Sequence, residues 1–98
     1  MNIQTDFWLG QIVATAYVND LMIKKRAFKD FCMECLCRHL VRDWGDLCEE
    51  DKKLNDVAFT TGERILSSYI YPSDNSNSIW IITEADRSVT TILFPYEY

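Results

Sequence analysis

The segment from Trp80 to Phe94 places the strongest constraint on the fold, because β-branched and aromatic residues alternate with polar ones on both sides of a short charged turn at residues 84–87. Alternation with a period of two predicts β-strands, and two such runs joined by a turn predict an antiparallel hairpin. The run from Ser78 to Glu84 carries large apolar residues at both odd and even positions. Both faces of that strand should therefore be covered, which predicts a central strand.

The rest of the chain adds helices and further strands. The expected elements are a strand over 9–14, helices over 16–23, 27–43 and 47–60, and strands over 63–71, 78–84 and 88–94. Thr15 is expected to cap the first helix through its hydroxyl. The order β-α-α-α-β-β-β predicts an α+β domain with about three helices packed on one face of a mostly antiparallel sheet of three to four strands. A length of 98 residues supports one such domain, over residues 1–98.

The second and third helices have clear sequence signals. In the second, apolar residues recur at intervals of three and four: Phe28, Phe31, Cys32, Cys35, Leu36, His39 and Leu40. In the third, Asp46 followed by Glu49 is the pattern of a capping box, in which each side chain bonds the other's backbone N–H. The expected buried face of the third helix consists of Leu47, Leu54, Val57 and Ala58. Gly62 stands where a C-terminal cap is expected.

The cysteines and the single histidine allow two chemical readings besides core packing. Cys32, Cys35 and His39 share one helical face, and thiolates with imidazole suit zinc. Cys35 and His39 are also spaced so that they could form a nucleophilic pair. Cys37 points away from this face. Because the same positions continue an apolar stripe and free cysteine is often buried, we interpret the group as core and predict no metal, cofactor or catalytic site.

The overall charge argues against some classes of partner. A net charge of −5 repels phosphate backbones, and the one dense basic run is Lys24-Lys25-Arg26 followed by Lys29. Direct nucleic-acid binding is therefore not expected. The sequence holds no run of about 18 apolar residues and no basic leader pattern, so we expect no membrane association and a cytoplasmic location.

Two acidic segments are the candidate partner-binding surfaces. The candidate residues are Asp43, Trp44, Asp46, Glu49, Glu50 and Asp51 in the first, and Glu84, Asp86 and Arg87 in the second. Acidic side chains also serve as helix caps and solvated turns, which is the alternative interpretation of both segments. Trp44 is a candidate aromatic anchor. An enzymatic divalent metal site that uses Glu84, Asp86 and the acidic residues near Trp44 is a third possibility without a recognisable motif.

The chain also resembles a known family. The matching segments are residues 9–15, 43–47, 50–52 with 55–56, 62 with 64–69, and 80–93. Together they resemble a family of small bacterial proteins of unknown function that plasmids and integrative elements encode. Residues 27–42 depart from the family pattern. Some members carry the name of a type I restriction modification subunit.

That name conflicts with the chemistry of the chain. An adenine methyltransferase needs a glycine-rich cofactor loop and an Asn/Asp-Pro-Pro-aromatic motif, whereas Pro72 and Pro95 are the only prolines and the three glycines are scattered. The resemblance instead implies a non-enzymatic anti-CRISPR or anti-restriction protein, which binds and inhibits a host defence nuclease through an acidic surface. The alternative is an accessory factor for replication, transfer or regulation of the element, as a monomer or homodimer.

Overall fold

A computed structural model describes residues 9–72 and 77–98. Its elements are β1 (Gln11–Ala14), α1 (Ala16–Lys24), α2 (Arg26–Leu40), α3 (Glu49–Thr61), β2 (Ile65–Ile70), β3 (Ser78–Thr83), β4 (Val89–Leu93) and a 3-10 turn, η1 (Pro95–Glu97). The predicted order and the α+β class are confirmed. The Thr15 hydroxyl accepts a hydrogen bond from Val18 N at 3.4 Å, and Gly62 ends α3 in the left-handed conformation, as expected. No described helix has both the length and the apolar character that a membrane span needs.

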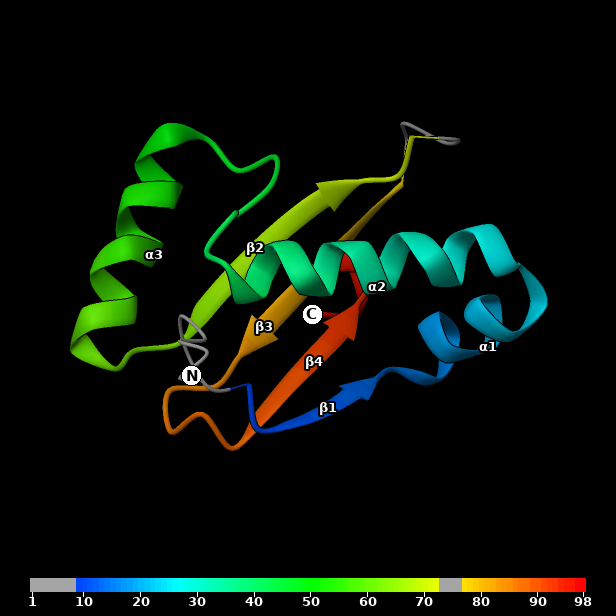
Figure 1. Cartoon of the computed structure of the whole chain (residues 1–98), viewed down its shortest axis with the longest axis horizontal. Helices are drawn as coiled ribbons and strands as arrows, with labels where there is room; N and C mark the ends of the chain where they lie inside the picture. The colour runs from blue at the N-terminus through cyan, green and yellow to red at the C-terminus, as the bar shows by residue number, and fades with distance from the viewer. Residues whose placement is uncertain (1–8, 73–76) are drawn as a thin grey trace, which may run out of the picture.

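The sheet has the strand order β1-β4-β3-β2. The pairs β2–β3 and β3–β4 are antiparallel, whereas β1 pairs with β4 in parallel. A mostly antiparallel sheet with β3 in its interior is therefore confirmed. Figure 1 shows the chain crossing from β1 through the helices to β2 at the far side of the sheet, and then returning strand by strand. The two outer strands are β1 and β2.

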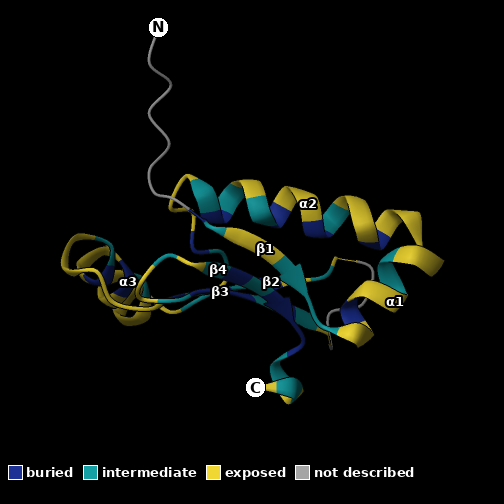
Figure 2. Ribbon diagram, turned by 90° about the horizontal axis from the view of Figure 1, so that it is seen from below, coloured by how far each residue is buried: buried dark blue, intermediate teal, exposed yellow. Residues whose placement is uncertain are grey.

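The main core lies between α2 and the sheet. Figure 2 shows α2 crossing one face, with its buried side turned toward the strands. The buried residues of this cluster are Val18, Phe28, Cys32, Cys35, Tyr69, Ile79, Ile81, Ile92 and Phe94. Burial raises the pKa of both Cys32 and Cys35 to about 12, so both thiols stay protonated and act as small apolar groups. The predicted stripe of the second helix is thus a packing surface, and α2 ends at Leu40 rather than near Asp43.

The third helix lies beside the outer strand β2 (Figure 1). A smaller apolar cluster joins it to the sheet, with Leu9, Trp44, Ala58 and Ile65 buried. Leu40 and Phe59 pack against this cluster from α2 and α3. The small cluster positions α3, while most of the surface of that helix stays exposed.

His39 lies at the centre of a buried chain of hydrogen bonds. Its Nδ1 lies 2.6 Å from Ser67 Oγ on β2, and its Nε2 lies 2.9 Å from Thr83 Oγ1 on β3. Thr83 Oγ1 lies 2.8 Å from Thr90 Oγ1 on β4, which donates to Leu9 O at 2.6 Å. The chain therefore connects α2, all three antiparallel strands and the segment that leads into β1.

The direction of each hydrogen bond follows from the last acceptor. Leu9 O can only accept, so the Thr90 hydroxyl donates to it and must accept from Thr83. Thr83 then accepts from His39, which carries its proton on Nε2, and the unprotonated Nδ1 accepts from Ser67. With a neutral imidazole, every group in this series of hydrogen bonds has a partner. Burial, followed by the positive charge of Arg87, lowers the pKa of His39 from 6.5 to about 3.

This arrangement makes the stability of the fold dependent on pH. The folded pKa of His39 lies below its ordinary value, so the unfolded chain binds the proton first as the pH falls. The free energy of unfolding should be highest above pH 6.5 and decrease toward pH 3, by at most about 1.4 kcal/mol per pH unit. Urea titrations over this interval measure the slope.

NMR titration provides an independent check, because the chain has one histidine. The imidazole signals of the folded protein should not shift between pH 7 and about pH 4, since the ring stays neutral in that interval. His39→Gln serves as the control for the urea experiment and should lack the His39 part of the slope. An ordinary histidine titration near 6.5 in the folded state would contradict the buried hydrogen-bond chain.

Candidate functional site: the acidic segment and the third helix

Asp43 holds the turn that follows α2. Arg38 donates to its carboxylate from Nε at 2.7 Å and from Nη2 at 3.2 Å, and Gly45 N donates to Oδ1 at 3.1 Å. The hydrogen bond from Arg38 is the main reason that the pKa of Asp43 is lowered. This pair is partly exposed, so it contributes little free energy by itself but fixes where the acidic segment starts.

Trp44 is not the exposed aromatic anchor that we expected. Its side chain belongs to the core, with the residue 3% exposed, and its ring meets the His39 ring edge-on. The indole Nε1 donates to Asp56 Oδ1 at 2.9 Å, which brings a carboxylate of α3 to the ring. A tryptophan needs a partner for its N–H when buried, and here Asp56 provides it. Trp44 therefore attaches α3 to the sheet and does not lie on the surface.

Asp46 does not form the capping box that we expected with Glu49. The third helix begins at Glu49 with Cys48 at its N-cap, and no side chain caps it. The Asp46 carboxylate instead accepts from Ile70 N at 2.8 Å, and Asp46 N donates to Ser68 O at 2.7 Å. Ser68 N in turn donates to Trp44 O at 3.3 Å. The acidic segment thus covers the outer edge of β2, where exposed backbone groups would otherwise invite another strand.

Asn55 completes this cover from α3. Its Nδ2 donates to Leu66 O at 2.6 Å, and its Oδ1 accepts from Leu66 N at 3.3 Å, so one side-chain amide takes the place of a neighbouring strand. Asn55 is buried, which turns this side of α3 toward the sheet. As a result Leu54 and Val57, which we expected in the core, are 66% and 53% exposed. The apolar face predicted for the third helix is therefore wrong, except for Ala58 and the half-buried Leu47.

The role of Asn55 predicts a specific pattern of stability changes. Asn55→Ala leaves both backbone groups of Leu66 without their partners, and should lower the free energy of unfolding by about 2 to 3 kcal/mol in urea denaturation. The matched control is Leu54→Ala on the adjacent position, which should change stability by less than about 0.5 kcal/mol. The opposite ranking would mean that Leu54 is in the core and that α3 has the orientation predicted from sequence.

The second acidic segment, at the β3–β4 turn, is organised around Arg87. Arg87 has a left-handed backbone with φ of 61°, and its guanidinium donates to Glu63 O at 2.7 Å and to Ala58 O at 3.3 Å. It therefore joins the turn to the C-terminal end of α3, where the negative end of the helix dipole favours a cation. Asp86 is exposed and accepts from Ser88 N at 2.9 Å, and Glu84 is half-buried. Hydrogen bonds from Ser88 lower the pKa of Asp86.

The structure places the two candidate segments at opposite ends of α3. Residues 43–48 precede the first turn of this helix, whereas Arg87 donates to Ala58 O in its last turn. Figure 1 shows the turn between β3 and β4 near the end of α3 that leads into β2. A helix of 13 residues is roughly 20 Å long. The nine candidate residues therefore do not form one compact site. The acidic groups that stay exposed nearest to one another are Glu49, Glu50 and Asp51, in the first turn of α3.

The cysteines, the histidine and the acidic residues are the side chains that could hold a metal ion. Within residues 9–72 and 77–98, no cluster of three histidine, cysteine or acidic side chains has the geometry of a metal site. Both ring nitrogens of His39 are engaged by Ser67 and Thr83, and Cys37 is exposed, as predicted.

Comparison with known proteins yields no match: no family model, no curated protein and no solved structure matches this chain.

Proposed function

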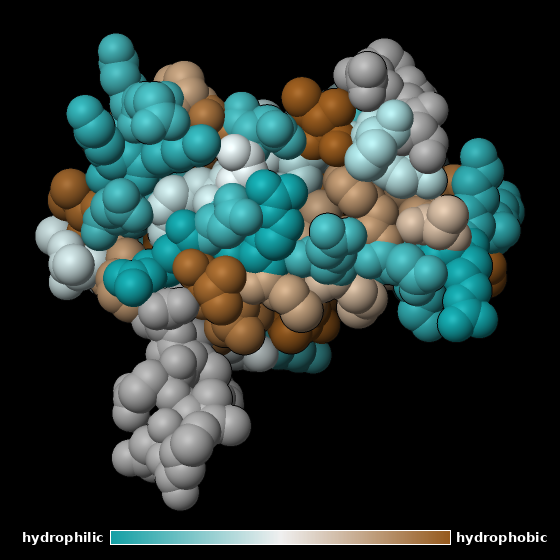
Figure 3. All heavy atoms as spheres, turned by 45° about the horizontal axis from the view of Figure 1, so that its top comes forward, coloured by the Kyte–Doolittle hydropathy of each residue, from teal (hydrophilic) through white to brown (hydrophobic). Residues whose placement is uncertain are grey.

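We propose that this chain is a non-catalytic binding protein that inhibits a host defence nuclease through the acidic surface of α3. The observation that carries the proposal is the charge of residues 43–63, which contain seven acidic residues and two lysines and hence a net charge of −5. Figure 3 shows the α3 end of the molecule, on the left, as mostly hydrophilic surface with hydrophobic groups set among it. Such a surface suits a basic partner.

The exposed side of α3 has the pattern of a docking helix. Glu50, Leu54, Val57 and Thr61 follow one another at intervals of four, three and four, so they form one stripe. Two aliphatic side chains in the middle provide apolar contact area, and Glu49 and Asp51 flank the start of the stripe. The complementary partner surface is an apolar depression bordered by lysine or arginine.

Nucleases of bacterial defence systems supply such surfaces. They bind nucleic acid in channels lined by lysine and arginine, which attract an acidic protein over a long range. The resemblance to plasmid and integrative-element proteins supports this choice, because such elements are the targets of Cas9-type effectors and restriction enzymes. The bacterial cytoplasm is the place where inhibitor and nuclease would meet.

Charge reversal on α3 tests the proposal. A Glu49→Lys/Glu50→Lys variant should lose at least about tenfold in affinity for a retained nuclease, because both carboxylates lie at the start of the docking stripe. The matched control is Asp30→Lys/Glu34→Lys, which makes the same change of charge at exposed positions of α2. The measurement is capture by the tagged protein of a Cas9–guide RNA complex or a type I restriction complex, followed by a DNA cleavage assay.

Leu54→Ala separates the apolar contribution from the charge. It should weaken capture several-fold while leaving the free energy of unfolding unchanged, since Leu54 is exposed in the free protein. Equal capture by wild type, the α3 variants and the α2 control would contradict the proposed surface. Absence of any captured defence nuclease would contradict the proposed partner class.

The second candidate is an accessory factor of the mobile element that acts through protein–protein contacts as a homodimer. The observation in its favour is the outer strand β1, which within the described residues pairs with β4 alone and carries no charge. Ile12 on this strand is 48% exposed, whereas the edge of β2 is covered. Light scattering should then show a dimer that Ile12→Lys converts to monomer. A monomeric wild type would remove the structural support for this candidate.

A further inference from the structure

A hollow of about 480 Å³ lies at the end of the molecule formed by α1, the first turn of α2 and η1. Its lining includes Leu21, Lys25, Phe28, Tyr71, Phe94 and Tyr96. Phe28 and Phe94 are buried and form its apolar base, whereas Lys25 and Tyr96 are exposed at its rim. The volume and the apolar base with a few polar groups are typical of pockets for small ligands. None of its lining comes from α3.

The aromatic rings of this hollow form a continuous stack. The rings of Phe28 and Phe94 have centroids 5.9 Å apart, and those of Phe94 and Tyr96 are 5.4 Å apart with an angle of 7° between their planes. Tyr71 meets Phe28 edge-on at 5.5 Å. Offset stacks of this kind accept a further planar ring, because aromatic faces attract one another over this range of distances. The pocket therefore favours a flat ring over a branched aliphatic group.

The outermost ring is held in place by the backbone turn that carries it. Glu97 Oε1 accepts from Phe94 N at 2.8 Å and from Thr15 Oγ1 at 2.8 Å, which ties η1 to the start of α1. Pro95 fixes the backbone between them. Tyr96 is 73% exposed, yet its ring lies parallel to Phe94. A ligand that stacks here meets walls that are already ordered, so it loses less free energy on binding.

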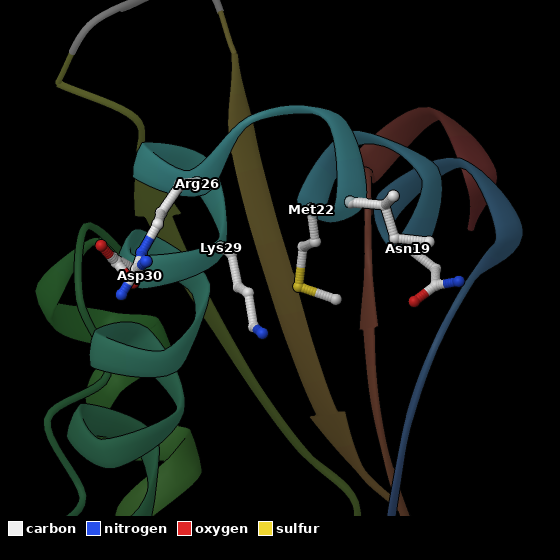
Figure 4. Close-up of a pocket in the computed structure, with 6 residues that line it drawn as sticks. Asn19, Met22, Arg26, Lys29 and Asp30 are labelled. Atoms are coloured by element: carbon white, nitrogen blue, oxygen red, sulfur yellow. The ribbon is translucent and has the colours of Figure 1, made fainter.

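A second hollow, of about 470 Å³ between α1 and α2, provides a contrast. Figure 4 shows that its walls are long side chains, among them Met22, Arg26 and Lys29. Ordering such side chains costs conformational entropy, whereas rings already packed by neighbours lose little. The aromatic hollow is therefore the better preorganised of the two.

We propose that the aromatic hollow binds a planar aromatic or heteroaromatic anion, the class that includes nucleoside monophosphates. The stack supplies the surface for the ring, and Lys25, which lines the hollow and is exposed, supplies the positive charge for the anion. The protein as a whole is acidic, but the corner between α1 and α2 is locally basic, with Lys24, Lys25, Arg26 and Lys29. This site is separate from the α3 surface, so it does not depend on the proposed inhibitor function.

Three related compounds, tested with the full chain, separate the contribution of the ring from that of the anion. Adenosine 5′-monophosphate has both ring and anion, adenosine lacks the anion, and ribose 5-phosphate lacks the ring. In calorimetry or ligand-observed NMR at low salt, the monophosphate should bind at least about fivefold more tightly than either of the others. Absence of binding by the monophosphate at millimolar concentration overturns the proposal.

Two pairs of variants locate the site. Tyr96→Ala should weaken binding of the monophosphate about tenfold, whereas Tyr98→Ala changes another exposed tyrosine beside the same turn, packed on Trp80, and should have no effect. Lys25→Gln should make the monophosphate bind no better than adenosine, whereas Lys24→Gln, whose lysine pairs with Asp20, should not. Equal loss in both members of either pair overturns the assignment to this hollow. Unchanged binding in all four variants also overturns the assignment to this hollow.

Discussion

The hydrogen bonds of His39 are the interaction on which the rest of the structure depends. A neutral imidazole in the core bonds β2 and β3 directly, and through two threonines it reaches β4 and the segment before β1. Each buried polar group in this chain would cost about 1 to 3 kcal/mol if it lost its partner. Any shift of strand register that separates these hydrogen-bonded groups would therefore cost free energy. The apolar residues around them contribute packing.

Several acidic residues after α2 stabilise the fold itself. Asp43 fixes a turn, Asp46 covers the edge of β2, and Asp56 satisfies the indole of Trp44. Asp46 and Asn55 together close the outer edge of β2 to other strands. The carboxylates that remain for a partner are those of the first turn of α3, and that is a smaller surface than the sequence suggested.

The elements of the fold could be predicted from sequence because each has a local cause. The period of two from Trp80 to Phe94 and the stripe of the second helix are visible in any short window. The errors concern contacts between segments distant in sequence. The capping-box pattern pairs Asp46 with Glu49, three residues away, whereas its carboxylate bonds Ile70. The apolar spacing of the third helix places Leu54 in the core, whereas the helix turns Asn55 inward and leaves Leu54 exposed. His39 belongs to the predicted stripe, but its hydrogen-bond partners Ser67, Thr83 and Thr90 have no distinctive pattern, since serine and threonine are ordinary residues on strands.

The acidic residues of the chain are concentrated in and just before α3. Residues 43–63 carry a net charge of −5, and the remaining positions hold eight acidic and eight basic residues. Arg42 and Arg87 lie against the second half of α3, at Phe59 and at Ala58 O, so the negative charge is strongest at the first turn of this helix. In the field of a basic channel, a body 36 Å long with this distribution experiences a torque as well as an attraction. It would rotate during its approach so that α3 leads and the aromatic hollow trails. An encounter with such a partner would then begin in the orientation that contact requires, and the opposite end would stay open to solvent.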